Sequence, residues 1–479
     1  MTGLPPRIHP LVRSFLDDEA GPAGLLAQWG SPLNVLFPEI FAANVASFGD
    51  VLTASGLRWR LCYAHKASQG RAFVRAAQAA GIGIDVASPG ELDSALSAGF
   101  PPDRIEATGP KGRDFLAVLA RSGVTVNVDN PWELDEIIRL ARARGHRVPV
   151  LVRLCGLAPG RPSRFGMPAI GFGAVVATLS AARDAVDFLG LSFHLDSAAV
   201  TDRVRAADEC LRLLEQAWSA GLGPRVLDVG GGFRQAFADS GAPFEAYGRA
   251  VQDGLSGQGP PLTWGGATLG YRFEDGAVRG ALTSAKYAGT GGGADFLREL
   301  MASPLPGQGG RPLARVLREN MIELWLEPGK ALVDHAGLTL ARVEFIKEAA
   351  DGSTLVNLDI SRDKICPADQ EVMLDPVLVG PARPPAAEIP VGVYFAGNLC
   401  LERDMICQHL TRLGHLPEPG DIVGFVNTAG YQMDLSASEA LLRPRPAKVV
   451  VRTTVTGFTA CADTDHEETP ACSTSTSPS

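Results

Sequence analysis

The sequence predicts an α/β protein in which a (β/α)8 barrel precedes a second, mostly antiparallel β-domain. Two observations predict this fold class. Short strand-like runs alternate with helix-like runs from about residue 39 to residue 330, and this alternation is typical of parallel βα units. From residue 331 onward, β-rich runs follow one another without helices of similar weight. About eight strands fall in the first region, which is the number of strands in a (β/α)8 barrel.

The barrel strands are expected where apolar runs end in polar residues. Such ends indicate chemistry, because functional groups of this fold gather at the carboxyl ends of its strands. The strand at 32–37 is expected to join the β-domain and to bring the two ends of the chain together. The eight expected barrel strands lie at residues 58–66, 82–88, 104–109, 124–129, 148–155, 188–196, 225–232 and 322–329.

Four segments follow from these patterns. Residues 1–38 form an N-terminal arm and strand, and residues 39–330 form the barrel. An insertion at about 254–320, rich in Gly and Pro, is either a lid over the site or an inert surface excursion. Residues 331–459 form the β-domain. The polar stretch 460–479 is expected to be a disordered tail.

Composition argues against several classes of function. The 479 residues are 46% hydrophobic and 20% charged, and the formal net charge is -9. An acidic chain is not drawn to nucleic acid or to an anionic membrane, and no apolar run approaches a transmembrane span. The eight cysteines include no C-x-x-C pair. We therefore expect reduced thiols, no metal site and a cytoplasmic protein.

Lys66 stands where the apolar run "RLCYAHK" gives way to a loop. A lysine on a half-buried element costs free energy unless it has a partner or a task. It is either a structural lysine, at the surface or in an ion pair, or a lysine that forms a Schiff base. These residues alone leave both readings open.

Other strand ends carry groups that suit an anionic or planar ligand. The three glycines of "DVGGGF" would let backbone N–H groups approach a phosphate closely. His194 and Ser197 of "FHLDS" could meet a ring and a phosphate, and Glu327 of "LWLEPGK" could hold a protonated pyridine nitrogen. Each group also has a structural reading as a tight turn, a core histidine or a turn-capping carboxylate.

Taken in order, these segments resemble the fold-type III pyridoxal-phosphate decarboxylases, the family of ornithine and diaminopimelate decarboxylases. The resemblance runs from about residue 30 to residue 455. It implies a barrel that binds pyridoxal 5'-phosphate, a β-domain like that of alanine racemase, and a head-to-tail homodimer with shared active sites. The motifs that carry it include "YAHKAS", "GIGIDVASPGEL", "VNVDNPWEL", "FHLDS", "DVGGGF", "EPGKAL", "GNLCLERD" and "NTAGY".

The resemblance implies a role for each matching residue. Lys66 forms the Schiff base with the cofactor, His194 stacks on its ring, and Glu327 pairs with the pyridinium nitrogen. Cys400 is the acid that protonates the product. Cys400 and Tyr431 resemble β-domain residues that reach the cofactor of the other subunit. The remaining cofactor-binding residues are Asp85, Arg153, Ser197, Gly230, Gly231 and Gly232.

Several positions depart from the family pattern. Asp196 stands where glycine is usual, Lys330 replaces an arginine, and Leu401 replaces an acidic residue that faces the substrate. These changes leave cofactor binding in place and disfavour ornithine and diaminopimelate as substrates. Glu402 is expected to compensate for Leu401. Asp375 is expected either to bind a distal amine of the substrate or to cap a turn.

The expected reaction is decarboxylation of a diamino acid or a larger amino-acid conjugate, with release of carbon dioxide and an amine. The departures are similar to a branch associated with siderophore and other secondary-metabolite pathways. A racemase or epimerase using the same cofactor is one alternative. The other is a non-catalytic regulatory homologue, although such a protein has no need of Lys66, Glu327 and Cys400 together.

Overall fold

Eight parallel strands close into a barrel, as the sequence predicts. In the computed structural model, residues 3–18, 21–158, 162–197, 199–380, 390–435, 437–455 and 457–465 are described. The strands follow one another in the order β5-β4-β3-β2-β14-β9-β8-β6, and pairing of β5 with β6 closes the ring. The barrel strands are β2 (Trp59–Ala64), β3 (Gly83–Val86), β4 (Ile105–Ala107), β5 (Thr125–Val128), β6 (Val148–Cys155), β8 (Val186–Ser192), β9 (Val226–Asp228) and β14 (Glu323–Leu326).

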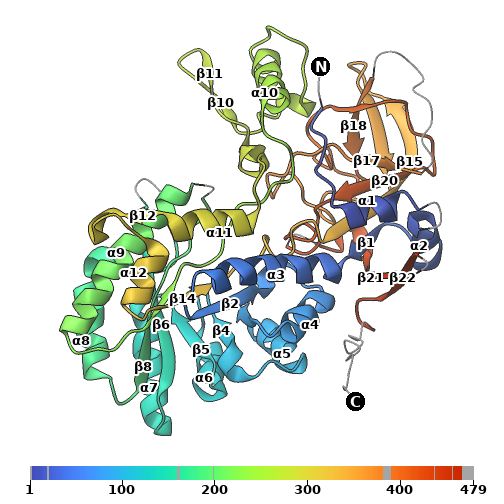
Figure 1. Cartoon of the computed structure of the whole chain (residues 1–479). Coiled ribbons are helices and arrows are strands. Elements are labelled where there is room, and N and C mark those ends of the chain that lie inside the picture. The colour runs from blue at the N-terminus through green and yellow to red at the C-terminus, as the bar shows by residue number, and fades with distance from the viewer. Residues whose placement is uncertain are drawn as a thin grey trace, which may run out of the picture.

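Helices surround the barrel on its outer side (Figure 1). Local sequence explains where several of them begin and end. Ser88 and Asn130 cap two helices by accepting the backbone N–H groups of Glu91 and Glu133, and Gly145 ends the second helix with a φ of 69°. The helices around the barrel are α3 (Pro38–Ala54), α4 (Arg71–Ala79), α5 (Pro89–Ser97), α6 (Arg113–Ser122), α7 (Pro131–Arg144), α8 (Phe172–Ala181), α9 (Val200–Ser219), α11 (Gly293–Ala302) and α12 (Leu313–Glu319).

A small apolar cluster inside the barrel separates its two ends. Leu151, Leu189, Val226 and Trp325 are buried together, and they come from four different strands. Such side-chain layers fill barrels of this kind. Polar residues of the site lie toward the carboxyl ends of the strands, where Lys66 follows β2 and Glu327 follows β14.

A curled mixed sheet forms the second lobe. The N-terminal strand β1 (Leu33–Leu36) pairs antiparallel with β15 and parallel with β21, so the expected joining of this strand to the β-domain is confirmed. Pairing of β16 with β18 is also parallel, and most other pairs are antiparallel. The remaining strands are β15 (Gly337–Glu348), β16 (Thr354–Leu358), β17 (Val377–Val379), β18 (Val391–Ala396), β19 (Thr411–Leu413), β20 (Ile422–Val426), β21 (Ala447–Thr454) and β22 (Gly457–Ala462).

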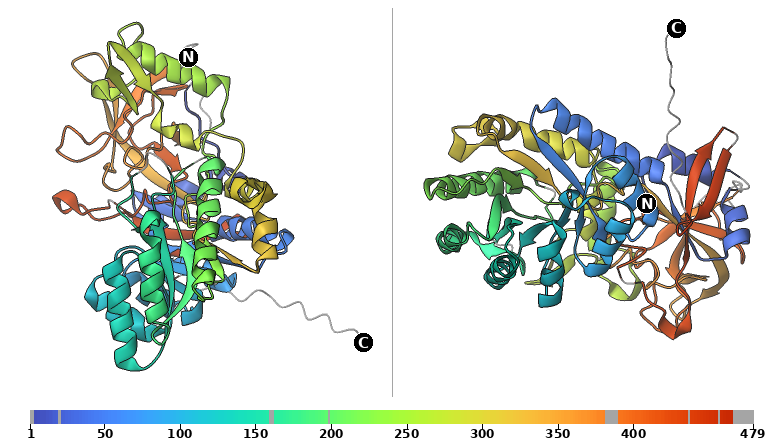
Figure 2. Two further views of the ribbon diagram at one scale, coloured as in Figure 1. Left: turned by 90° about the vertical axis from the view of Figure 1, so that its left-hand side faces the viewer. Right: turned by 90° about the horizontal axis from the view of Figure 1, so that it is seen from below.

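The region expected as an insertion divides into two parts. Helix α10 (Ala242–Leu255) and the hairpin of β10 (Tyr271–Glu274) and β11 (Ala277–Gly280) stand beside the β-domain and away from the barrel helices (Figures 1 and 2). Helices α11 and α12, in contrast, contact α3, α9 and β14 of the barrel. The excursion therefore begins before the expected range of about 254–320, with α10 at Ala242, and the latter part of that range holds ordinary barrel helices. Short strands in this region are β12 (Pro304–Leu305) and β13 (Arg311–Pro312), whereas β7 (Met167–Pro168) pairs with barrel strand β6.

The two ends of the chain meet at the second lobe. Helices α1 (Pro10–Leu16) and α2 (Gly21–Trp29) precede β1. The first residues of the tail expected at 460–479 are ordered, which corrects that expectation for residues 460–465. Residues 460–462 belong to β22, which pairs with β21, and the Asp463 carboxylate accepts the N–H groups of Arg71 and Ala72. Residues 466–479 of that prediction lie outside the described residues. Among the described helices, none is long and apolar enough to cross a membrane.

Candidate active site

Lys66 lies on a single 3-10 turn, His65–Ala67, that follows β2 directly. Its Nζ donates to Asp85 Oδ2 at 2.8 Å, and Asp85 Oδ1 accepts from Thr108 Oγ1 at 2.6 Å. Burial would lower the pKa of Lys66, but the attraction of Asp85 and Glu327 outweighs burial and raises it above the ordinary lysine value. The cofactor-free chain therefore holds Lys66 as an ammonium, paired with a buried carboxylate.

Glu327 belongs to a cluster of three buried carboxyl groups. Glu106, Asp228 and Glu327 each offer an oxygen within 4.8 Å of the others, and the Asn127 amide donates to Glu106 at 3.0 Å and to Glu327 at 3.4 Å. Burial, followed by the neighbouring carboxylates, raises the pKa of Glu327 and Glu106 well above ordinary values. Three such neighbouring carboxyl groups cannot all ionise. Part of this cluster, which includes Glu327 just after β14, therefore remains protonated.

Arg153 lies near the carboxyl end of β6, and His194 follows the neighbouring strand β8 at the same end of the barrel. Burial lowers the pKa of His194 well below its ordinary value, so the ring is neutral, and its Nδ1 accepts the N–H of Gly231 at 3.2 Å. Arg153 Nη1 lies 4.0 Å from Asp129, and its guanidinium lies over the Phe165 ring at 4.7 Å from the centroid. A neutral ring and a fixed cation thus face the same side as Lys66.

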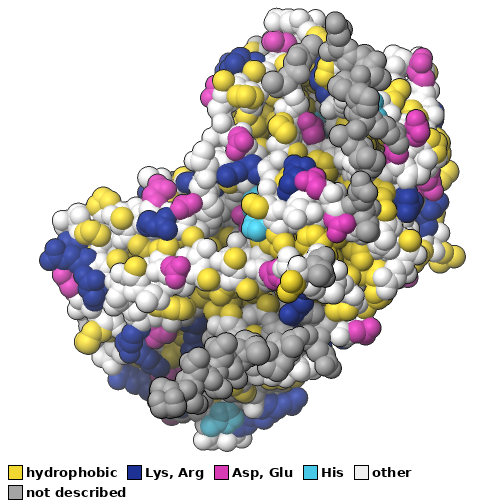
Figure 3. All heavy atoms as spheres, turned by 45° about the vertical axis from the view of Figure 1, so that its right-hand side comes forward, with side chains coloured by type: hydrophobic (Ala, Val, Ile, Leu, Met, Phe, Trp, Pro, Cys, Tyr) yellow, Lys and Arg dark blue, Asp and Glu magenta, His cyan; other side chains and the backbone are white. Residues whose placement is uncertain are grey.

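Lys66 stands between two adjoining cavities that also share His194, Asp196 and Glu327. The first, of about 300 Å³, extends toward the β-domain. The second, of about 750 Å³, extends toward Arg153. In the space-filling view, basic and acidic side chains lie next to one another near the centre of this face (Figure 3). The smaller cavity is lined by Gly232, Gln235, Lys286, Lys330, Glu371 and Tyr431, among others.

Lys286 of the excursion lines the smaller cavity, and Tyr287 lines an adjoining cavity that shares Lys286 and Lys330 with it. Lys330 Nζ donates to the Tyr287 hydroxyl at 2.7 Å, and Lys286 Nζ lies 2.5 Å from Glu371 and 3.7 Å from Asp196. Asp196, which departs from the family pattern, thus meets a basic group. The 3-10 helix Thr283–Tyr287 therefore connects the barrel end to the second lobe through charged contacts.

Comparisons with known proteins agree with this arrangement. Residues 42–261 match the family model described as pyridoxal-dependent decarboxylase, pyridoxal binding domain. An uncharacterised protein of Sinorhizobium fredii is 31% identical over 456 residues, which are 94% of each chain. Diaminopimelate decarboxylase of Bacillus subtilis is 26% identical over 454 residues, covering 89% of this chain and 88% of the relative.

The chain belongs to the pyridoxal-phosphate-dependent decarboxylase family. Its cofactor is pyridoxal 5'-phosphate. Solved structures share the fold: a diaminopimelate decarboxylase from M. jannaschii in complex with L-lysine superposes with a TM-score of 0.69 at 20% identity, covering 96% of this chain and 95% of that chain. The enzyme from Helicobacter pylori gives a TM-score of 0.67 at 17% identity, with 91% and 95% covered.

The residues of this decarboxylase-family site fit the cofactor. Gly230 and Gly232 have φ angles of 67° and 72°, and a Cβ on either glycine would collide with the carbonyl of Phe193 or Leu195. The backbone is thus closely packed around the loop that a phosphate would meet. Lys66 supplies an amine, and Glu327 supplies a carboxyl for a ring nitrogen.

Two predicted residues take unexpected positions. Tyr431, expected to serve the cofactor of another subunit, lines the cavity of its own chain. Its backbone N–H donates to the Ala67 carbonyl at 2.7 Å, which ties the turn around Tyr431 to the Lys66 turn. The Ser197 hydroxyl donates to Asp202 at 2.6 Å and lies in a third cavity of about 400 Å³ that shares Gly232 and Lys330.

The three other predicted residues lie apart from Lys66. Asp375 accepts the N–H of Leu4 at 2.7 Å and lies 3.2 Å from His409 Nε2; none of the cavities that include Lys66 includes Asp375. Glu371, four residues earlier, lines the smaller cavity instead. Cys400 and Glu402 are exposed on the loop after β18 and line neither cavity of their own chain.

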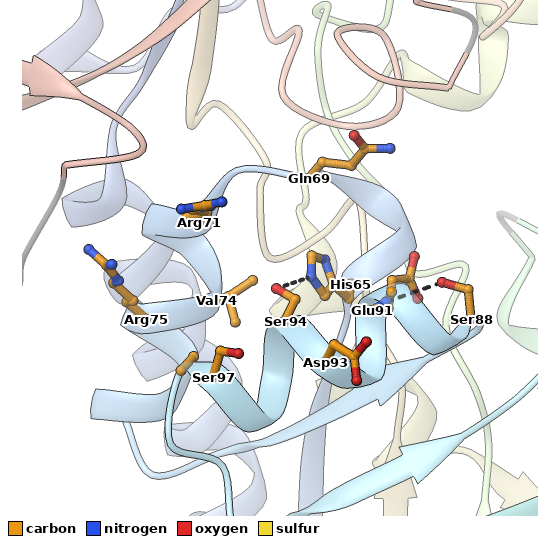
Figure 4. Close-up of a pocket in the computed structure, with 12 residues that line it drawn as sticks. His65, Gln69, Arg71, Val74, Arg75, Ser88, Glu91, Asp93, Ser94 and Ser97 are labelled. Atoms are coloured by element: carbon orange, nitrogen blue, oxygen red, sulfur yellow. Dashed lines mark hydrogen bonds between the residues drawn. The ribbon is translucent and has the colours of Figure 1, made fainter. Parts of the chain in front are cut away.

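His65 turns away from Lys66. Its ring bonds the Ser94 hydroxyl at 3.0 Å and the Ser68 carbonyl at 3.2 Å, and it lines a separate cavity between α4 and α5 (Figure 4). In the same view the Ser88 hydroxyl, at the start of α5, accepts the backbone N–H of Glu91. His65 therefore has a structural role, since its ring bonds Ser94 and Ser68 and lines neither cavity around Lys66.

Sequence reasoning missed several residues of the site. Glu106 and Asp228 sit within apolar strands, and a carboxylate in such a run is a signal that could have been used. Lys286 and Tyr287 carry no comparable signal, because the excursion has no regular pattern. Thr108, which fixes Asp85, lies in "ATGPKG", a further segment that resembles the family, but the resemblance implied no role for this threonine.

Proposed function

We propose that the chain decarboxylates an amino acid or an amino-acid-derived substrate, releasing carbon dioxide and an amine, as a homodimer with shared active sites. The observation that carries the proposal is the placement of Lys66. Its Nζ lies at the mouth of the barrel, paired with Asp85 at 2.8 Å, in cavities lined by His194 and Glu327. An amine, a neutral imidazole and a carboxyl that can pass its proton to a ring nitrogen are the groups that this chemistry requires.

The chain's residues divide the work as follows. When bound, pyridoxal phosphate supplies an electron sink for the pair left by cleavage of the bond between Cα and the carboxylate. Lys66 provides the amine that attaches the cofactor, and Asp85 orients that amine. Glu327 holds a proton for the ring nitrogen, and His194 supports the ring. The Cys400 thiol is the proposed acid that returns a proton to Cα after carbon dioxide has left.

Exposure of the Cys400 loop supports a second copy of the chain as its partner. Leu401 is 46% exposed and Leu442 is 96% exposed, and exposed apolar side chains gathered on one surface are typical of a protein contact site. The loop and the segment around Leu442 are both bonded to residues 361–364, through the Arg403 and Arg443 carbonyls among others. A homodimer would cover these leucines and bring Cys400 to the other chain's Lys66.

The cavities favour a substrate larger than a simple α-amino acid. The cavity toward Arg153 has about 750 Å³, and Glu371 and Asp196 offer carboxylates for a distal amine in the smaller one. A diamino acid or an amino-acid conjugate meets both conditions. Modified amino acids of siderophore and other secondary-metabolite pathways belong to this class.

The experiment uses the cofactor-loaded protein in heavy water with a panel of diamino acids and conjugates in both configurations. Loss of carbon dioxide with gain of one deuterium at Cα would establish the decarboxylase and identify its substrate. Tyr431 and Lys66 line one cavity, which also suits a racemase. Deuterium exchange with the carboxylate retained would assign that reaction instead.

Shared sites are tested by mixing two inactive variants, K66A and C400A. If each site needs Lys66 of one chain and Cys400 of another, half of the randomly formed dimers contain one intact site. Activity would then recover to about one quarter of the wild-type value. No recovery, although subunit exchange is demonstrated, would contradict the shared site.

A further inference from the structure

Arg203 is a fully buried cation directly behind the glycine loop. It lies on α9 at 0% exposure. Its Nη1 donates to the Val229 carbonyl at 2.7 Å, and its Nη2 donates to the carbonyls of Leu195, at 2.6 Å, and Gly231. The guanidinium thus joins the loop that follows β8 to the loop that follows β9.

No carboxylate of the described residues forms an ion pair with Arg203 within 4.0 Å, and its Nε has no hydrogen-bond partner there. Burial lowers the pKa of Arg203 to about 10, and the more distant carboxylates of Asp196 and Asp228 offset only part of that effect, so Arg203 remains cationic at neutral pH. Both carboxylates have other contacts, since Asp196 lies near Lys286 and Asp228 accepts the N–H of Gly230 at 2.7 Å. A buried charge without a direct partner is costly, so a further anion close to Arg203 would stabilise it.

Peptide geometry points to where such an anion would sit. In a trans peptide the C=O and N–H groups point in opposite directions, and Ser31–Pro32 is the one cis bond found in the described chain. Because the carbonyls of Leu195 and Gly231 point at Arg203, the N–H groups of Asp196 and Gly232 point away from it. Both residues line the cavity of about 400 Å³.

The backbone N–H of Gly232 has no hydrogen-bond acceptor within the described chain, and a Cβ at this position would collide with the Leu195 carbonyl. An outward N–H beside Lys330 and Ser197 suits an anion of the cavity.

We propose that Arg203 is a positioning residue for the cofactor's phosphate. It holds the two loops with their N–H groups turned into the cavity, and its charge offsets that of the phosphate from behind the backbone without touching it. The phosphate therefore adds to the countercharge of Asp196 and Asp228 on an arginine that is hidden from the site.

The test compares pyridoxal phosphate with pyridoxal, which lacks the phosphate. Dissociation constants for both are measured with the wild type, R203M, R203K and a matched control, R104M. Arg104 also donates to backbone carbonyls, of Ile82 and Gln78, and lies over the Phe100 ring, but it lines none of the cavities around Lys66.

R203M is expected to weaken pyridoxal phosphate about 10- to 100-fold while pyridoxal changes less than about threefold. R203K keeps the charge and loses the fork, so its loss is expected to be smaller. R104M should change neither constant. Equal losses for the two ligands in R203M, or no loss, would overturn the proposal.

Two further measurements apply if R203M does not fold. R203K must then weaken the phosphate form more than pyridoxal, and equal weakening would overturn the proposal. In the wild-type holoprotein, the ³¹P shift of the bound phosphate is followed against pH. The second ionisation of a free phosphate monoester lies near pH 6. We expect a dianion that persists to about pH 5, and an ordinary titration near pH 6 would contradict the assignment.

Discussion

Replacing Tyr287 by Phe removes one oxygen atom from the cavity of about 400 Å³ that Tyr287 lines with Lys330 and Gly232. The replacement tests whether the excursion belongs to the active site. The hydroxyl accepts from Lys330 Nζ at 2.7 Å and donates to the Gln370 carbonyl at 3.1 Å. The ring stacks on Phe237 with centroids 5.0 Å apart. Because Phe keeps this stack, the perturbation is confined to the hydroxyl.

The expected loss follows from the hydrogen bond to a charged group. Such bonds contribute about 1.5–3 kcal/mol, and since Lys330 is only partly buried, the lower value applies. Because the same bond exists before the cofactor binds, about 1.5 kcal/mol is the upper limit of the loss in binding, which corresponds to at most roughly tenfold weaker binding. Lys330 and Gly232 line the same cavity, so the loss should appear in the affinity for pyridoxal phosphate.

Y287F should also change the pH dependence. Burial already lowers the pKa of Lys330, and removal of the acceptor lowers it further. Lys330 attracts a phosphate only as the ammonium, so affinity falls as pH rises through its pKa. In Y287F this fall should begin at lower pH than in the wild type.

The assay is titration of the apoprotein with pyridoxal phosphate between about pH 6 and pH 10, followed by visible absorbance. Y271F is the matched control, because the Tyr271 hydroxyl donates to the Gly248 carbonyl at 3.2 Å within the same excursion and lines no cavity around Lys66. Y271F should bind the cofactor like the wild type. Unchanged affinity and an unchanged pH profile in Y287F would refute the reasoning.

Three further predictions concern the lysine, the thiol and stability. K66A should abolish the visible absorbance band of the cofactor-loaded protein, and an unaltered spectrum would refute the assignment of Lys66. C400A should lower kcat about 100-fold or more with cofactor affinity within about twofold, whereas equal damage to both would make Cys400 structural. Burial raises the pKa of Asp334 to about 8, above its unfolded value of about 3.9. The native state therefore favours the protonated form, and stability should fall as pH rises from about 4 to about 8. D334N should remove this fall and add at most about 4 kcal/mol at pH 7, measured by urea unfolding; equal slopes for both proteins would contradict it.

Local sequence patterns were sufficient for the barrel and for the residues that follow its strands. The expected strand ends at Lys66, His194 and Glu327 all meet at one end of the barrel. Strand alternation is a short-range property, and parallel strands of one barrel place their carboxyl ends together, so sequence order was enough. The strand at 32–37 was also predicted to join the second sheet, and it pairs with β15 and β21.

Residues of irregular segments were beyond such patterns. Asp375 was expected near the substrate, yet it bonds Leu4 and His409, while Glu371 faces the cavity. Both lie in one segment without regular structure. Which of two nearby carboxylates points inward depends on long-range contacts, which local spacing does not encode.

The sequence by itself determined the succession of strands and the chemical groups at their ends, because both depend on neighbours in the chain. Tertiary structure alone decided which distant groups share a charge environment. Barrel closure brings Glu106 of β4 within 4.8 Å of Asp228 and Glu327, and the excursion brings Tyr287 to Lys330. These contacts join residues that lie far apart in the sequence, and burial then sets the protonation of the carboxyl groups through the low polarity of the interior.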